Sequence, residues 1–416
     1  MRYGIDDKPP LKDFLLYALQ WWVVTLPCVV IMGAVTAMLH APDTAFHILY
    51  MQKLFAVMGA ATIIQVLVGH RLPLIIGPAS TLLVGIIASV SSGMDALYSS
   101  IFLGGAILSA AGFAGLFAKL RFFFTPRIVA VVLVLIAFTL SPTILKLVAP
   151  GDAGAFPLCF AVALVVSLAY CNYKLTGAAK SLTVLFGMVG GTLVYWLGKG
   201  FPSLHAIPVT ESFFPLHIEL AFHPGTLLAF VFCFLALAVN ELGSIEAVGH
   251  MLQADGMNGR VRRGIGVTGI ANMASGWLGV IGPVDFSMSS GIIAATGCAS
   301  RFTLIPAGAG LIACAFFPDF ILVLSAIPAP VMGALLLYLM ASQLASGLAM
   351  LVTGKSVSDF TSSITVALPL MIGLIVAFAP GAVFNAFPDL LRPIVGNGFV
   401  MGTLAVILLE HGIFRK

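Results

Sequence analysis

The sequence predicts an all-α polytopic membrane protein in which the two halves of the chain form an inverted repeat. Three observations predict this class: an apolar composition, a regular series of membrane-length segments, and two sequence echoes half a chain apart. Of the 416 residues, 60% are hydrophobic and 9% are charged, and the mean hydropathy is +1.10, far outside the range of soluble globular proteins. This composition excludes a soluble enzyme. The net charge of +4 comes from Lys and Arg in short loops, which excludes a basic face for nucleic acid.

The apolar segments supply about fourteen candidate membrane spans, at roughly 20 residues for each span. Several of these segments are short or interrupted by Gly and Pro. Their ranges are 14–36, 51–69, 74–92, 97–117, 127–148, 156–173, 181–199, 225–248, 263–282, 287–299, 303–325, 329–350, 362–380 and 393–412.

The distribution of Lys and Arg predicts the orientation, because these residues concentrate in cytoplasmic loops. With the N-terminus inside the cell, only four of the 20 Lys and Arg residues fall outside: Lys53, Lys146, Lys199 and Arg392. A wrong number of spans would invert every later loop and destroy this bias. We therefore expect a multi-pass protein of the cell (inner) membrane, in contact with lipid, with both termini in the cytoplasm. The first apolar run is too long for the core of a signal peptide, so we expect it to be the first span.

Two echoes at similar offsets predict a duplicated unit of seven spans. An Ile-Gly-Pro sequence ends at Pro78 and returns at Pro283, 205 residues later, while Pro126 and Pro328 open the fifth and twelfth spans, 202 residues apart. Seven is odd, so the second copy enters the membrane from the opposite side. Inverted repeats of this kind are typical of secondary transporters.

The third and tenth spans each contain Gly-Pro and Ser where a continuous helix would need helix formers. We expect a short extended segment followed by a half-helix in both. Transporters with such interrupted helices bind substrate near the midplane, where free backbone N–H groups and positive dipole ends meet. The alternative is that Gly and Pro only kink ordinary helices.

The stretch FLALAVNELGSIEAVGH, residues 234–250, places carboxyl groups in an otherwise apolar span. An intramembrane charge costs from a few to roughly 10 kcal/mol or more, so Glu241 is a candidate functional residue. A carboxyl group in a partly dry cavity holds its proton more readily than in water, which would link proton uptake to substrate binding. The alternative is a structural Glu between helices. Glu246 lies about 140° around the helix, so we expect a solvated or structural role, while Asn240 either orients Glu241 or bonds to a neighbouring helix.

The segment MSSGIIAATG, residues 288–297, resembles the signature of the nucleobase-ascorbate transporter family, also called nucleobase:cation symporter-2 or xanthine/uracil permeases. That signature is Gln, Glu or Pro, then Asn, any residue, Gly, four residues, Thr, and Arg, Lys or Gly. Gly291, Thr296 and Gly297 match it, whereas Met288 and Ser289 depart from it. The resemblance covers most of the chain.

Two further landmarks support the resemblance: IPAPVMG at 327–333 and GNGFVMGTLAVILLE at the last span. The resemblance implies a fold of fourteen spans divided into a core domain that carries substrate and a gate domain. The core domain would comprise residues 1–117 and 201–327, and the gate domain residues 118–200 and 328–416, often in a homodimer. It also implies import of a nucleobase, either uracil or a purine such as xanthine or urate, by proton symport with an elevator-type movement and without a cofactor. Sodium is the less supported coupling ion, because the sequence has no clustered carbonyl-and-carboxylate site.

The same resemblance assigns candidate site residues. Glu241 corresponds to the family's span-eight glutamate, which grips the base and is tied to proton coupling. The family usually has Gln or Glu at the position of Met288, and this side chain hydrogen-bonds to the base. Met288 cannot do so in the same way. Asp285 therefore either supplies the missing carboxylate or caps the half-helix. Trp21 stands where the family often has His, so it either stacks on the base or lies at the lipid interface. The remaining candidates are Gln20 on the first span, Ala79, Ser80 and Thr81 on the third, and Ser287, Ser289 and Ser290 on the tenth.

Three alternatives remain open. Related inverted-repeat folds carry sulfate or bicarbonate, although a fixed carboxylate at Glu241 would repel an anion unless it is protonated. The ascorbate branch of the family usually has Pro at the position of Met288. A membrane-embedded enzyme or channel is the third, but the sequence has no His-rich metal cluster, nucleophile elbow or phosphate-binding loop.

Overall fold

The structure is a computed structural model that describes residues 1–40, 43–117, 125–151, 154–202, 219–354 and 356–414. Within these ranges, eight helices are long and apolar enough to cross a membrane, or nine if Arg301–Ala315 and Pro318–Ser325, bent by 88°, form one span. The prediction of a multi-pass membrane protein is confirmed. The other predicted span ranges carry shorter helices, a strand followed by a helix or, at 263–282, most of the 22-residue helix Met257–Leu278, which is less apolar.

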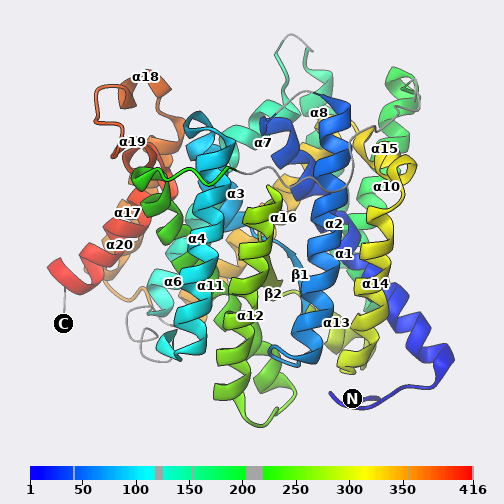
Figure 1. The fold of residues 1–416 in the computed structure, drawn as a ribbon. Helices are drawn as coiled ribbons and strands as arrows, with labels where there is room; N and C mark the ends of the chain where they lie inside the picture. Colours follow the sequence, from blue (N-terminus) through cyan, green and yellow to red (C-terminus); the bar gives the residue numbers. More distant parts are fainter. Residues whose placement is uncertain (41–42, 118–124, 152–153, 203–218, 355, 415–416) are drawn as a thin grey trace.

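The first half of the chain folds into long helices interrupted by one strand (Figure 1). Its elements are α1 (Leu11–His40), α2 (Thr44–Leu67), β1 (Ile75–Pro78), α3 (Ser80–Ser89), η1 (Val90–Ser92), α4 (Met94–Phe113), α6 (Pro126–Thr139), α7 (Ser141–Val148), α8 (Phe156–Lys174), α9 (Gly177–Ser181) and α10 (Thr183–Lys199).

The second half repeats this pattern of helices around one strand. Its elements are α11 (Pro224–Met251), α12 (Met257–Leu278), β2 (Pro283–Phe286), α13 (Ser289–Thr296), η2 (Arg301–Thr303), α14 (Leu304–Ala315), α15 (Pro318–Ser325), α16 (Ala329–Thr353), α17 (Phe360–Phe378), α18 (Gly381–Phe384), α19 (Arg392–Val395), α20 (Gly398–Leu408) and η3 (Leu409–Ile413).

Several long helices begin at side chains that accept from their free N–H groups. Asp43 accepts from Phe46 N at the start of α2, and Thr125 caps α6 with Pro126 in its first turn. Asp359 forms a capping box with Ser362 at the start of α17. Such caps satisfy N–H groups that have no partner inside the helix, so these starts are encoded locally.

Glycines let α4 and α12 pack with their backbones in contact. A Cβ on Gly112 of α4 would lie 2.6 Å from the backbone N of Gly266 on α12, and one on Gly105 would lie 2.7 Å from Met273 N. Small residues at helix contacts are the usual means of close approach in membranes, where van der Waals packing replaces the hydrophobic effect. The pairing holds α12, the least apolar of the long helices, against its neighbour.

The helices pack in two groups. In the first, α1, α2, α3, α4, α11, α12 and α14 contact one another, and in the second α6, α7, α8, α10, α16, α17 and α20 do so. Figure 1 shows the two strands near the middle of the first group.

The two strands form a buried antiparallel ribbon. Pro78 pairs with Pro283 and Ile75 with Phe286, and all residues of the ribbon except Phe286 are buried. Each strand leads into a short helix, β1 into α3 and β2 into α13. The prediction of an extended segment followed by a half-helix is therefore confirmed at both spans, and the alternative of two kinked helices is wrong.

Candidate functional site

The free edge of β2 organises the polar residues of α11 and α12. A two-stranded ribbon leaves N–H and C=O groups unpaired on its outer edges, and inside a membrane the protein itself must satisfy them. The N–H of Asp285 donates to Oε2 of Glu241 at 2.9 Å, and Ser244 Oγ donates to the Asp285 carbonyl at 3.1 Å. Asn272 Nδ2 donates to the Pro283 carbonyl at 2.9 Å. Polar side chains in apolar helices thus take the place of a third strand.

The second carboxylate oxygen of Glu241 joins a chain of hydrogen bonds that crosses three helices. Thr268 Oγ1 on α12 donates to Oε1 of Glu241 at 2.5 Å. Gln65 Nε2 on α2 donates to the same Thr268 oxygen at 2.7 Å and to Gly264 O at 2.9 Å. The Glu241 side chain is fully buried, so in this conformation both of its oxygens bind protein groups.

Asp285 directs its carboxylate to a buried histidine. Oδ2 lies 3.4 Å from Nε2 of His70, and both side chains are 0% exposed. The backbone N–H of Leu72 donates to His70 Nδ1 at 2.9 Å, which places the ring proton of a neutral imidazole on Nε2, facing Asp285. Asp285 does not cap the half-helix, because α13 has Met288 at its N-cap and no side-chain cap bond, so that alternative is wrong.

Asn240 and Glu246 take different positions on α11. Asn240 Nδ2 donates to the Asp285 carbonyl at 3.4 Å, so it bonds to the ribbon rather than to Glu241. Glu246 is partly exposed, in line with its place on another face of the helix.

The candidates on α3 and α13 divide into buried connectors and exposed side chains. Ser289 is buried, accepts from Ile75 N at 2.9 Å and donates to Phe286 O at 2.7 Å. Ala79 is buried and its N–H donates to Gly282 O at 2.9 Å. Ser287 and Met288 are exposed at the start of α13. The half-buried Ser80 donates to Gln343 Oε1 on α16 at 3.3 Å, which connects the two groups of helices.

The candidates on α1 have separate environments. Trp21 is 2% exposed, and its indole N–H donates to Thr303 Oγ1 at 3.0 Å, so it packs against η2. Gln20 is half-buried, and its Nε2 atom has no hydrogen-bond acceptor within the described part of the chain. Thr81, the third candidate on α3, is also buried without a partner for its hydroxyl among those residues.

Comparison with known proteins decides the family. The model of a permease family, that of the xanthine and uracil permeases, matches residues 12–382. The chain belongs to this family. The expected resemblance is confirmed, and the protein is a transporter of the membrane rather than an enzyme.

Individual relatives agree with this assignment, and a solved structure shares the fold. The permease is 28% identical to the uric acid permease PucJ of Bacillus subtilis over 85% of this chain and 82% of PucJ. It is 27% identical to the nucleobase transporter PlUacP of Paenibacillus larvae over 85% of this chain and 83% of that protein. Its fold matches the transmembrane domain of the cyanobacterial bicarbonate transporter BicA with a TM-score of 0.62 and 13% identity, over 92% of this chain and 97% of that domain.

Three residues that contact Glu241 or Asp285, or their partners, were not predicted from the sequence: His70, Thr268 and Gln65. Thr268 and Asn272 are four residues apart in a predicted span, so they lie on one helix face, and polar residues inside spans are candidates by default. That signal would have found Thr268 and Gln65. A single His in a loop before an extended segment carries no such signal.

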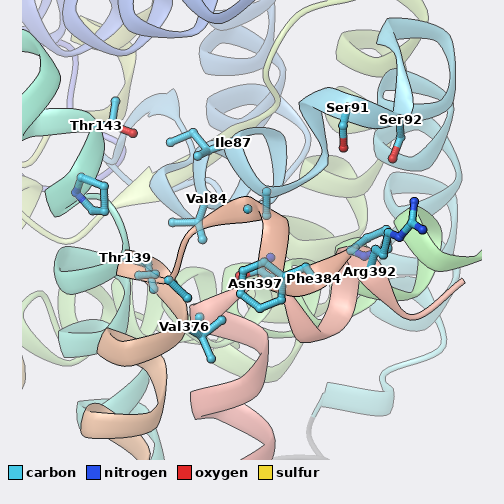
Figure 2. A pocket seen from close by; sticks show the side chains of 18 of the residues that line it. Val84, Ile87, Ser91, Ser92, Thr139, Thr143, Val376, Phe384, Arg392 and Asn397 are labelled. Atoms are coloured by element: carbon cyan, nitrogen blue, oxygen red, sulfur yellow. The ribbon is translucent and has the colours of Figure 1, made fainter. Parts of the chain in front are cut away.

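A cavity of about 710 Å³ lies at the boundary of the two helix groups. Val84 and Ile87 of α3 line it on one side, and Thr139 of α6, Val376 of α17 and Asn397 before α20 line it on the other (Figure 2). Glu241, Asp285 and His70 are not among its lining residues. Across the described residues, no cluster of three His, Cys, Asp or Glu side chains could hold a metal ion.

Proposed function

We propose that this permease imports a nucleobase, uracil or a purine such as xanthine or urate, together with a proton. The family, with a uric acid permease and a nucleobase transporter among its members, supports the substrate class. Proton coupling is supported by one observation: Glu241 is a fully buried carboxyl group in an apolar helix, at the edge of the ribbon. Such a group is retained inside a membrane only when its cost is offset by function or by dedicated partners.

The geometry around Glu241 accommodates both protonation states. As a carboxylate, Glu241 accepts from the Thr268 hydroxyl and from the Asp285 N–H. A proton on Oε1 would reverse the first bond, because a hydroxyl can accept as well as donate. The Thr268 hydroxyl would then turn toward Gly264 O, one helical turn earlier, as Thr commonly does in helices. The partners around Glu241 therefore suit either protonation state without a change in the backbone.

The base would bind where α3 and α13 begin beside the ribbon. The first N–H groups of a helix have no partner inside it, and the positive end of the dipole favours electron-rich atoms such as base carbonyl oxygens. Ser80 on α3, and Ser287 and Met288 immediately before α13, supply accessible side chains there. Glu241 would bind the base by replacing one of its internal hydrogen bonds, to the Thr268 hydroxyl or to the Asp285 N–H, with a hydrogen bond to the base. We assign substrate contact also to Ala79, Ser289, Gln20 and Trp21, and proton coupling to Glu241 and Asp285.

The two groups of helices would move relative to each other as an elevator. We assign residues 1–117 and 201–327 to a core domain that carries substrate and residues 118–200 and 328–416 to a gate domain, with fourteen spans in total. The close packing within each group and the cavity between them support this division. Both termini would lie in the cytoplasm, the protein in the inner membrane, and the gate domains would meet in a homodimer.

Uptake into proteoliposomes tests the proposed function. Radiolabelled uracil, xanthine and urate are offered with and without an inward proton gradient, to wild type, Glu241→Gln and the matched control Glu246→Gln on the same helix. Accumulation of one base that needs the gradient and is lost only in Glu241→Gln supports proton symport at this site.

Other results would overturn parts of the proposal. Accumulation driven by a sodium gradient alone would show that sodium, and not the proton, is the coupling ion. Uptake of bicarbonate, sulfate or ascorbate without any base would show that the fold serves another solute.

A further inference from the structure

Three arginines meet at the turn between α2 and β1. Arg260 Nη1 on α12 donates to the carbonyls of His70, at 3.0 Å, and Arg71, at 2.7 Å. Arg263 Nε, also on α12, donates to Gly69 O at 3.2 Å. These bonds bring the guanidinium groups of Arg260 and Arg263 to the turn that carries Arg71. We call Arg71, Arg260 and Arg263 the arginine cluster.

The arginine cluster has little negative charge to balance it. Among the residues that the structure describes, none of its three members forms an ion pair with a carboxylate. Arg301 of η2 is a fourth cation within electrostatic reach of Arg260, and it pairs with Asp6 at 2.6 Å. An excess of Lys and Arg on one side of the membrane is common, but it does not require that three of them share one turn. Because like charges repel, an anion bound at the cluster would be stabilised.

Arg71 occupies a backbone conformation that favours glycine. Its φ is 56°, in the left-handed region that residues with a Cβ rarely adopt. The side chain is exposed, and its Nε donates back to Leu67 O at 3.1 Å, so it fills no space in the interior. A glycine would suit this backbone better, so the reason for an arginine here lies in its side chain.

Exposed apolar side chains continue from the arginine cluster along α2. Ile64, Leu67 and Val68 are exposed, and their spacing places them on one face at the end of the helix. α2 is long and apolar enough to cross a membrane, so apolar side chains exposed near its end would lie against the acyl chains of the bilayer. A cationic cluster above an apolar helix face has the two parts that a phospholipid requires: donors for a phosphate and a surface for acyl chains.

We propose that the arginine cluster binds the phosphate of an anionic phospholipid, such as phosphatidylglycerol, whose acyl chains lie against the exposed apolar face of α2. Guanidinium groups suit phosphate because they present several N–H donors in one plane. Within the described residues, Arg71 and Arg263 each use one of five donors, so others are free for phosphate oxygens. A bound phosphate offsets the repulsion among the arginines and holds the turn that leads into β1, so lipid binding should stabilise the permease.

Native mass spectrometry of the purified permease, mixed with equal amounts of phosphatidylglycerol and phosphatidylcholine, measures the preference for the anionic lipid. Wild type should retain phosphatidylglycerol. Arg71→Gln/Arg260→Gln should lose this preference by about tenfold, because two cationic side chains near the headgroup are removed, whereas Arg71→Lys/Arg260→Lys keeps both charges and should keep most of it. The control Lys174→Gln/Lys180→Gln removes two exposed cations elsewhere and should resemble wild type.

Thermal unfolding in a neutral detergent supplies the second measurement. Phosphatidylglycerol should raise the Tm of wild type more than phosphatidylcholine does, and high salt should reduce this difference. Arg71→Gly suits the backbone, so it should unfold no earlier than wild type without lipid, yet gain less from phosphatidylglycerol.

Three results would overturn the proposal. The first is an equal preference for phosphatidylglycerol in wild type and in Arg71→Gln/Arg260→Gln, and the second is a loss of preference in the control Lys174→Gln/Lys180→Gln as large as in that variant. The third is displacement of the lipid by inorganic phosphate at millimolar concentration, which would make a free phosphate the ligand and leave the apolar face of α2 without a part in binding. None of these measurements uses a base, so their outcome is independent of the proposed function.

Discussion

Glu241 accepts the backbone N–H of Asp285 at 2.9 Å, so the carboxyl group proposed to carry the proton also completes the edge of the β-ribbon. The two roles respond differently to substitution. A Gln side chain keeps a carbonyl oxygen for the Asp285 N–H but cannot exchange a proton. An Ala side chain provides neither.

Glu241→Gln should therefore fold but fail to couple, while Glu241→Ala should also be less stable. Leaving the Asp285 N–H and the Thr268 hydroxyl without their acceptor costs about 1–3 kcal/mol for each buried group. Thermal unfolding in detergent, with uptake measured in parallel, separates the two effects. Equal stability of the Gln and Ala variants would show that the ribbon edge does not depend on Glu241.

Ser289 connects both strands through one hydroxyl, and its loss should weaken the ribbon. Ser289→Ala leaves Ile75 N–H and Phe286 C=O without their side-chain partner, which should lower stability by about 1–3 kcal/mol. Ser290→Ala is the matched control, because its hydroxyl bonds only to Ser287 O one turn earlier. Denaturation in detergent should show the larger loss for Ser289→Ala, and a reversed order would contradict this role.

Much of the fold follows from patterns in the sequence. The 20-residue apolar windows find the helices because the membrane fixes their length, and Gly-Pro at Pro78 and Pro283 marks the two extended segments because neither residue suits a helix interior. The burial of Glu241 could also be predicted, because a carboxyl group in the middle of an apolar membrane span is far from the aqueous phase. The pairing of Pro78 with Pro283 could not be predicted, because it joins residues half a chain apart.

The partners of the site were harder to predict than its central residue. His70 reaches Asp285 only because the chain folds back into the protein after α2, and Leu72 then selects its tautomer. Neither the contact of His70 with Asp285 nor the bond from Leu72 to His70 is marked in the sequence by a periodic pattern or a motif. The bond from the Trp21 indole N–H to Thr303, 282 residues later, is a further contact that no local pattern in the sequence marks.

Met288 is expected to limit the affinity for the base. Met288 is exposed at the start of α13. The family signature that this segment resembles usually has Gln or Glu at this position. A thioether is only a weak hydrogen-bond acceptor by comparison. Met288→Gln should lower the KM for the transported base about 2- to 10-fold, equivalent to ~0.5–1.5 kcal/mol for one hydrogen bond. Met288→Leu should leave the KM unchanged. If Met288→Gln leaves the KM of every base unchanged, position 288 does not face the substrate.

The hydrogen bond from Ser80 to Gln343 crosses between the two groups of helices, so it must break if these groups move during transport. A permease with Cys at positions 80 and 343 should lose transport when a short cleavable reagent links the two thiols, and recover it after cleavage. Because Cys159 is exposed and Cys171 is partly exposed, both are first replaced by Ser.

The control for this experiment is a cross-link that should not restrict movement. Ser342 and Ser346 are exposed and one turn apart on α16, so Cys at these positions can be linked within a single helix. The elevator movement predicts that the link between α3 and α16 stops uptake while the link within α16 does not, because only the first joins elements that change places. Uptake that continues with positions 80 and 343 linked would mean that α3 and α16 stay together throughout the cycle, and the movement would have to occur elsewhere in the molecule.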